Sequence, residues 1–435
     1  MKSIFKKVIA LILVIESRAT LSRYQPRIIA VTGSVGKTST KDAITTALTP
    51  LVSVRKSQKS FNSDIGVPLT ILGLPNAWDS PRRWFDNLLA GAKLAWGQKQ
   101  DFPEWLVLEI GADHPGDIKS IAKWLRPNVV VLTRFPDVPV HVEFFASPEA
   151  VIEEKRHMRK ALLPDGLLVV NADDERTLAE PIIQKQRKIT FGEKSGATIR
   201  AESSEIKYEN GRPVGLMVRV STGTGSIPLL MRGAIGTGHM HAALAALSVV
   251  HGLGLNIVTA AKALSEHQMP PGRMRLIEGK GGSVIIDDTY NASPVAVEAG
   301  LEALGSVQTE GERIFVLADM KELGVYSKNA HRSIGVAVGK AYQKKQLDYF
   351  LAVGTLTGEA ADAATENGMP QERVMRRLDA VTAATTLVGT IAENDVVLVK
   401  GSQSMRMERV VKAAMAHPEE ASKLLVRQES EWEER

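Results

Sequence analysis

Residues 28–39 have the sequence IIAVTGSVGKTS, in which an apolar strand, a glycine-containing turn and the start of a helix follow one another. Glycines let backbone N–H groups converge on phosphate oxygens, and the helix adds roughly half a positive charge at its N-terminus. Lys37 then extends toward the β- and γ-phosphates, and the Thr38 hydroxyl is a ligand for Mg²⁺. The turn is a shortened P-loop, because Thr32 stands where the full pattern has glycine. We therefore predict an ATP site formed by Gly33, Ser34, Val35, Gly36, Lys37, Thr38 and Ser39.

On either side of this turn, short apolar runs alternate with longer amphipathic stretches. The predicted strands are 28–31, 105–109, 129–133 and 167–171, and the predicted helices between them are 37–48, 116–125 and 148–162. This alternation is typical of parallel βαβ units with helices on both faces of a sheet. Between residues 198 and 230, turn sequences break shorter runs and predict a small antiparallel β-rich patch. We expect a central P-loop domain at 27–269, with an insertion at 76–103.

The consecutive prolines of Met269-Pro270-Pro271-Gly272 predict a linker, because proline stops a helix and lets the chain change direction. A second α/β alternation follows, with strands expected at 283–287, 313–318, 349–353 and 396–400. The predicted fold class is therefore α/β: a central P-loop domain with a parallel sheet and a small β-rich patch, then a Rossmann-like C-terminal domain at 270–435.

Composition supports a globular protein of more than one domain. A chain of 435 residues is too long for one hydrophobic core, and 44% hydrophobic with 24% charged residues is ordinary for folded domains. The net charge of +5 is mild, and no basic and aromatic residues interleave in a nucleic-acid-binding pattern, so we expect no nucleic-acid partner. The absence of cysteine excludes disulfides and thiolate metal sites and fits a cytoplasmic protein.

The N-terminal segment, 1–26, contains an apolar run at Val8–Ile15 behind Lys2, Lys6 and Lys7. Spanning a bilayer takes about 20 apolar residues, and this run is much shorter. Two interpretations remain. The segment is an amphipathic helix packed on the body of the protein, or it lies on a membrane surface with its lysines facing anionic lipid.

Five further motifs share the order that they have in the Mur ligase family, which the chain resembles. With the P-loop they are TGSVGKTSTK (32–41), SFNSDIGVPLTIL (60–72), LEIGADHPGDI (108–118), DDTYNASP (287–294), LADMKELG (317–324) and VLVKGSQSMRMERVV (397–411). The resemblance covers both predicted α/β domains. It implies an ATP-dependent ligase that activates a carboxylate as an acyl phosphate and joins it to an amine.

The resemblance also assigns roles to residues beyond the P-loop. Glu109 ends an apolar strand, where a carboxylate points into the ligand crevice, and in the family this glutamate serves the metal ions. Alone, Lys155 is typical of a solvated surface lysine. The family pairs such a lysine, in carbamylated form, with a histidine fourteen residues earlier as ligands of a second Mg²⁺, and His141 keeps that spacing. A carbamate offers the anionic oxygens that a hard cation prefers.

Across the linker, motifs resembling the family's nucleotide-closing elements supply Arg273 for phosphates and Asn291 for an adenine edge. Asp319 lies in a loop expected to line the cleft. Lys400 is either a cation that assists the substrate or a surface lysine at a strand end.

Within the family, the motifs are most similar to those of members that add D-Ala-D-Ala to a UDP-MurNAc-peptide. Those ligases begin with a separate UDP-binding domain, whereas only 32 residues precede Gly33, so we expect that domain to be missing. Three alternatives stay open: a related ligase for another carboxylate (a lipid-linked or non-UDP precursor, or a folylpolyglutamate-type substrate), a P-loop ATPase, and a nucleotide-binding regulator without turnover.

Overall fold

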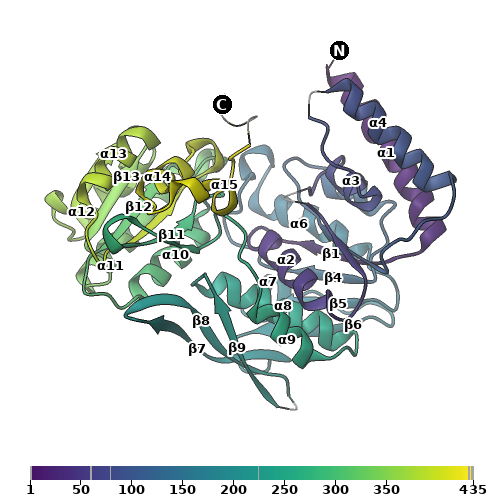
Figure 1. Cartoon of the computed structure of the whole chain (residues 1–435), viewed down its shortest axis with the longest axis horizontal. Helices are drawn as coiled ribbons and strands as arrows, with labels where there is room; N and C mark the ends of the chain where they lie inside the picture. Colours follow the sequence, from purple (N-terminus) through teal and green to yellow (C-terminus); the bar gives the residue numbers. More distant parts are fainter. Residues whose placement is uncertain (1, 59–60, 79, 224, 430–431, 433–435) are drawn as a thin grey trace.

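The computed structural model describes residues 2–58, 61–78, 80–223, 225–429 and 432. Two β-sheets, each covered by helices, account for most of these residues (Figure 1). Both sheets are mixed and mostly parallel, which confirms the predicted α/β class.

The first sheet has the strand order β2-β3-β1-β4-β5-β6-β7-β8-β9. Its strands are β1 (Arg27–Thr32), β2 (Val54–Lys56), β3 (Trp105–Glu109), β4 (Val129–Leu132), β5 (Leu167–Asn171), β6 (Arg187–Gly192), β7 (Ile199–Glu209), β8 (Arg212–Ser221) and β9 (Ser226–Arg232). In this spatial order, each pair of neighbouring strands from β2 through β1 to β7 is parallel. Because β1 and β3 are neighbours, the P-loop after β1 and Glu109 at the end of β3 lie at the same edge of the sheet.

Helices cover both faces of this sheet. One core contains residues of α2 (Lys37–Leu48), α8 (Thr237–Gly252) and α9 (Ile257–Ser265), and the other contains residues of α3 (Gly66–Leu72), α5 (Asp117–Ala122) and α6 (Pro148–Lys160). The short α7 (Glu175–Leu178) follows β5. Strand residues of β1, β3 and β4 alternate between the two cores, as expected for a sheet buried on both sides.

The predicted β-rich patch is the antiparallel set β7, β8 and β9, which extends the first sheet. It also reaches the second sheet's domain, where Ile206 and Tyr208 pack against that domain's core. The Tyr208 hydroxyl accepts a hydrogen bond of 2.7 Å from the Gln308 backbone N–H. The patch therefore joins the two halves of the molecule.

The second sheet has the order β10-β11-β15-β12-β13-β14. Its strands are β10 (Arg275–Glu278), β11 (Val284–Asp288), β12 (Arg313–Ala318), β13 (Tyr349–Val353), β14 (Val374–Arg377) and β15 (Val396–Lys400). One face packs on α10 (Pro294–Ser306), α11 (Ser327–Gln343) and α12 (Thr357–Glu366), and the other on α13 (Ala380–Thr390), α14 (Glu408–Ala414) and α15 (Ala421–Leu424). Only β10, at the edge, is antiparallel.

In the described part of the chain, six short 3-10 helices connect these elements. They are η1 (Val142–Phe144), η2 (Lys280–Gly282), η3 (Gly324–Tyr326), η4 (Gln371–Arg373), η5 (Gln403–Met405) and η6 (Pro418–Glu420).

The N-terminal helix α1 (Lys2–Tyr24) lies beside α4 (Pro81–Trp96), which belongs to the predicted insertion (Figure 1). Ile9 and Leu13 of α1 are buried against Leu69, Leu72 and Trp84. One face of the N-terminal helix therefore packs on the protein, which leaves its opposite face for other contacts. Within the described residues, every helix is too short or too polar to cross a bilayer.

Candidate active site

The turn between β1 and α2 has the geometry of a phosphate-binding loop. Gly33 has φ +144°, and a Cβ there would lie 2.0 Å from Thr133 Oγ1, so a side chain would clash with the end of β4. Gly36 has φ +83°, and a Cβ added there would have no heavy atom within 4 Å. Gly33 therefore lets the loop lie close to the sheet, and Gly36 leaves space on the other side of the loop.

Two residues at the start of α2 present polar atoms to this loop. The Lys37 ammonium donates hydrogen bonds to the carbonyl oxygens of Gly33, at 2.9 Å, and Ser34, at 3.5 Å, and burial lowers its pKa. The Thr38 hydroxyl oxygen accepts a 3.1 Å hydrogen bond from the Arg273 guanidinium, which comes from beyond the linker. Thr38 and Arg273 therefore connect the P-loop with the C-terminal half.

Glu109 ends β3 behind the P-loop and is 1% exposed. Its Oε1 accepts a hydrogen bond of 3.3 Å from Asn62, and its Oε2 lies 4.0 Å from the Lys41 ammonium. Oε2 is buried and has no hydrogen-bond partner among the described residues. A buried anionic oxygen that accepts no hydrogen bond costs free energy, which the Lys41 ammonium at 4.0 Å offsets in part and a metal ion bound beside it would offset further.

His141 stands at the contact between the two halves. Its Nδ1 lies 2.9 Å from Glu322 Oε2 of the C-terminal domain, and its Nε2 lies 3.5 Å from Asp113 Oδ1. The close contact with His141 holds the pKa of Glu322 below its ordinary value. Gly324 lies against the Cβ of Glu143, so the loop around Glu322 packs directly on η1.

Lys155 lies on the buried face of α6 and is 3% exposed, so the alternative of a solvated surface lysine is wrong. Its ammonium forms no hydrogen bond or ion pair with the described residues. Burial, with a further contribution from the Lys37 charge, lowers the pKa of Lys155 to about 7. A large fraction of this amine is therefore unprotonated near neutral pH.

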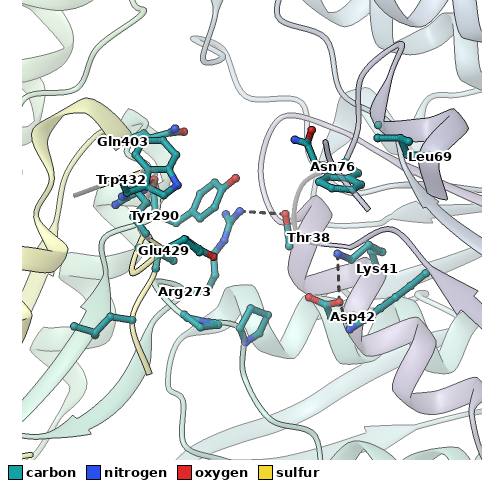
Figure 2. A pocket seen from close by; sticks show the side chains of 18 of the residues that line it. Thr38, Lys41, Asp42, Leu69, Asn76, Arg273, Tyr290, Gln403, Glu429 and Trp432 are labelled. Atoms are coloured by element: carbon teal, nitrogen blue, oxygen red, sulfur yellow. Dashed lines mark hydrogen bonds and ion pairs between the residues drawn. The ribbon is translucent and has the colours of Figure 1, made fainter. Parts of the chain in front are cut away.

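Arg273 is held from several sides. Its guanidinium stacks on the Tyr290 ring, 3.9 Å from the centroid, and its backbone oxygen is hydrogen-bonded to His239 of α8 at 2.5 Å. Its Nε is buried without a partner in the described part of the chain. Figure 2 shows Arg273 and Tyr290 on one side of a pocket and Thr38 on the other. Arg273 is therefore oriented to contact a ligand at the P-loop.

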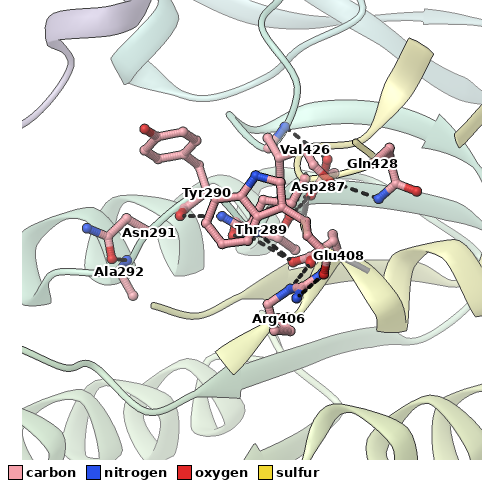
Figure 3. Close-up of polar contacts among 12 residues, drawn as sticks. Asp287, Thr289, Tyr290, Asn291, Ala292, Arg406, Glu408, Val426 and Gln428 are labelled. Carbon is pink, nitrogen blue, oxygen red and sulfur yellow. Dashed lines mark hydrogen bonds and ion pairs between the residues drawn. The ribbon is translucent and has the colours of Figure 1, made fainter. Parts of the chain in front are cut away.

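The segment 287–291 is fixed by buried polar contacts (Figure 3). Asp287 accepts hydrogen bonds from Gly272 N, at 3.0 Å, and from the Thr289 hydroxyl, at 2.6 Å, and burial raises its pKa to about 6. Arg427 donates to the carbonyl oxygens of Thr289 and Tyr290 and to Glu408. These contacts attach the linker to the C-terminal domain and keep Tyr290 beneath Arg273.

Lys400 ends β15 and is 2% exposed, so its interpretation as a surface lysine is wrong. Its ammonium lies 2.5 Å from Asp288 Oδ2 and donates to the Asn291 carbonyl oxygen at 3.0 Å. The side chain of Asn291 accepts a hydrogen bond from Ala292 N at 2.9 Å. Lys400 thus fixes the loop that presents Asn291.

Asp319 does not line the cleft. Its carboxylate accepts hydrogen bonds from the backbone and hydroxyl of Thr357, at 2.9 and 2.6 Å, and from Lys321 at 2.8 Å. It is 1% exposed and positions the start of α12. All these contacts of Asp319 lie within the C-terminal domain. The proposed nucleotide site therefore does not include Asp319.

Two adjoining pockets lie between the halves. The smaller, about 420 Å³, is lined by these predicted residues: Ser34, Val35, Gly36, Lys37, Thr38, Ser39, Glu109, His141, Arg273 and Asn291. The larger, about 960 Å³, shares Thr38 and Arg273 and extends to Ile9 of α1 and Trp84 of α4. Gly33 and Lys155 are not among the residues that line either pocket.

Several residues of this arrangement were not predicted from the sequence. Lys41 is buried, donates to Ser57 O at 3.0 Å and approaches Glu109, while Asn62 holds the other Glu109 oxygen. Lys41 follows Lys37 by one helical turn, a spacing that could have indicated it. His239 contacts Arg273 from 34 residues away along the chain, and no local pattern could have predicted that pairing.

Comparison with known families gives two matches. Residues 87–250 match the Mur ligase middle domain, and residues 272–403 match the Mur ligase glutamate ligase domain. Together these segments exceed half of the chain. They contain the whole second sheet and strands β3 to β9 of the first, whereas β1 and β2 precede the matched segment.

Individual proteins and solved structures similar to this chain also belong to this group of ligases. The chain is 26% identical over 402 residues to the UDP-N-acetylmuramoyl-tripeptide–D-alanyl-D-alanine ligase of Bacillus subtilis (strain 168), covering 92% of this chain and 79% of that protein. It is 28% identical over 389 residues to the enzyme of the same name from Escherichia coli (strain K12), covering 89% and 76%. The structure of MurF from Acinetobacter baumannii superposes with a TM-score of 0.74 at 25% identity, covering 92% and 79%. Because two Mur ligase domains match more than half of the chain, it belongs to the Mur ligase family of ATP-dependent, amide-forming ligases.

Proposed function

We propose that this ligase joins a peptide carboxylate to an amine at the smaller pocket, and that its substrates are a UDP-MurNAc-peptide and D-Ala-D-Ala. The observation that carries the proposal is that one pocket is lined by the P-loop, Glu109 and His141 from one domain and by Arg273 and Asn291 from the other. The names of the similar enzymes support these substrates.

The residues present fit MgATP. The open space at Gly36 suits phosphates, Lys37 and Arg273 supply cations to them, and Asn291 offers an amide to the adenine. Thr38, Glu109, His141 and a carbamylated Lys155 would hold two Mg²⁺ ions. The Glu109 oxygen that accepts no hydrogen bond and the buried amine of Lys155 both support this arrangement.

Carbamylation of Lys155 needs an unprotonated amine, which the lowered pKa provides. The Nζ lone pair forms a bond to CO₂ and a proton is released, which leaves an anionic carbamate. The side chain then repels neither Lys37 nor a cation, and it supplies oxygen ligands of the kind that Mg²⁺ prefers.

In the proposed reaction, the substrate carboxylate attacks the γ-phosphorus of ATP, and ADP leaves. The amine then attacks the acyl phosphate carbonyl, and phosphate leaves with formation of the amide. Two anions must meet in the first step, and the charges of Lys37 and Arg273 lower that barrier. Mg²⁺, when bound, adds charge neutralisation of the phosphates. Because the site is divided between two domains, closure would exclude water from the acyl phosphate.

The decisive experiment measures phosphate release with a UDP-MurNAc-tripeptide, with and without D-Ala-D-Ala. We expect release that depends on both substrates. If phosphate release requires a different carboxylate, the protein is still a ligase, but its carboxylate substrate is not a UDP-MurNAc-peptide. Release without any acceptor would instead indicate a P-loop ATPase.

A further inference from the structure

Helices α1 and α4 each carry an exposed apolar stripe. On α1, Val8, Leu11 and Ile15 are 49%, 62% and 49% exposed, and they are spaced by three and four residues. On α4, the stripe consists of Phe85, Leu89 and Trp96, which are 67%, 48% and 60% exposed. These spacings place each set on one face of its helix, and large contiguous apolar faces mark interaction sites.

The two stripes turn to the same side of the helix pair. Gly91 lies against Glu16, and Arg23 donates to the Ala95 carbonyl oxygen at 3.1 Å, so the helices run side by side in the same direction. Ser17, whose hydroxyl donates to the Pro68 carbonyl oxygen, marks the side of α1 that faces α3. At about 100° per residue, both stripes point away from α3 and from the body of the protein.

Basic side chains border this apolar face. Lys7 and Arg18 lie beside the stripe of α1, and Arg82 and Lys93 lie beside that of α4. All four are exposed, and none forms an ion pair with a described residue. Among the described exposed residues of the two helices, Asp86 is the single carboxylate. The face is thus apolar at its centre and cationic at its margins.

We propose that this face of α1 and α4 docks on an anionic lipid surface. A helix that lies in the membrane plane inserts its apolar side chains into the interfacial region. Its lysine and arginine side chains then lie at the level of the headgroups. A second copy of this chain fits less well, because pairing the faces would bring the same four cations against their equivalents. The proposal is independent of the ligase substrates.

Docking has a consequence for the site. Lys6 and Ile9 of α1 and Trp84 of α4 line the larger pocket, which adjoins the P-loop through Thr38. The docked helices would therefore hold the entrance of that pocket near the headgroups.

The test is co-sedimentation of the full chain with vesicles of phosphatidylcholine alone or of phosphatidylcholine mixed with phosphatidylglycerol. We expect binding to the anionic vesicles, weakened by salt, and little binding to the neutral ones. The double variant Leu11→Ser/Phe85→Ser should lower binding at least about tenfold. The charge variant Lys7→Glu/Arg18→Glu/Lys93→Glu should lower it by about tenfold or more.

Val258→Ser and Val381→Ser are matched controls, since both valines are 63% exposed on distant helices. They should bind like the parent chain, and unchanged melting temperatures would show that all variants are folded. Equal binding to neutral and anionic vesicles, or unchanged binding by the stripe variants, would overturn the proposal. Lipid-free dimers abolished by Leu11→Ser/Phe85→Ser would overturn it in favour of a second copy.

Discussion

At the scale of single residues, burial decides what two charged side chains can do. Lys155 is buried, and Glu109 keeps one buried oxygen that accepts no hydrogen bond from the described residues. Both arrangements cost stability unless another group completes them. A carbamate on Lys155 and a cation beside Glu109 would supply that group, which is why both residues are central to the proposed site.

Lys155→Ala should lower acceptor-dependent phosphate release about a hundredfold or more, because a metal ligand is lost. Added acetate or propionate should restore part of the activity by replacing the carbamate. Lys160→Ala, on the exposed end of the same helix, is the control. Full activity of Lys155→Ala without added acid would contradict the carbamate, as would the absence of a carbamate ¹³C signal in protein equilibrated with labelled bicarbonate.

Glu109→Gln keeps the shape and the contact with Asn62 but removes the negative charge. We predict a loss of roughly a hundredfold or more in kcat/KM, with a higher Mg²⁺ concentration needed for half-maximal rate. Titration of Mg²⁺ in the phosphate-release assay measures both quantities. An unchanged Mg²⁺ dependence would mean that Glu109 does not serve the metal.

At the scale of elements, the pairing of α1 with α4 includes a buried carboxyl group. Glu16 is 2% exposed, its Oε2 has no partner among the described residues, and Gly91 leaves room for it on α4. Burial raises the pKa of Glu16 from 4.5 to about 7. The contact is therefore most favourable when this group is protonated.

This raised pKa predicts a pH dependence of stability. The folded state retains a proton that the unfolded state releases above pH 4.5, so the contribution is fully present below that pH and is lost as pH rises through about 7. Glu16→Gln should therefore raise the melting temperature at pH 8 by roughly 2 °C relative to the parent, and by less at pH 5. Thermal unfolding at both values checks this, with exposed Glu104→Gln as control. An equal shift at both pH values would be evidence against it.

The sequence predicted the strands that contain a continuous apolar run. Strands β3, β5 and β12 have the predicted bounds, because continuous apolar runs bury themselves on both faces. The short edge strands β10 and β14 were missed, since charged residues interrupt them and their neighbours stabilise them. Local patterns likewise located the P-loop and Glu109, whereas the internal contacts of Asp319 depend on tertiary structure.

At the scale of the whole molecule, contacts between the domains cross the smaller pocket. Among the described residues they include Arg273 with Thr38, His141 with Glu322, and His239 with the Arg273 backbone oxygen. In each, a residue proposed to serve ATP or Mg²⁺ is engaged by the opposite domain. MgATP binding would therefore exchange these contacts for ligand contacts and change how the domains close.

Arg273→Lys should raise the KM for ATP by roughly tenfold with a smaller effect on kcat, because lysine loses the planar stacking on Tyr290 and the forked donors. Steady-state kinetics with varied ATP measures both constants. Arg275→Lys, two residues on and lining only the larger pocket, should leave the KM for ATP unchanged. Equal effects of the two variants would contradict the role of Arg273.

The central claim is amide formation through an acyl phosphate, and isotope transfer tests it most directly. The carboxylate substrate that supports acceptor-dependent phosphate release is labelled with ¹⁸O, and the released phosphate is analysed by mass spectrometry. We predict that each amide formed is accompanied by phosphate carrying one substrate ¹⁸O. Amide product with unlabelled phosphate would contradict the account.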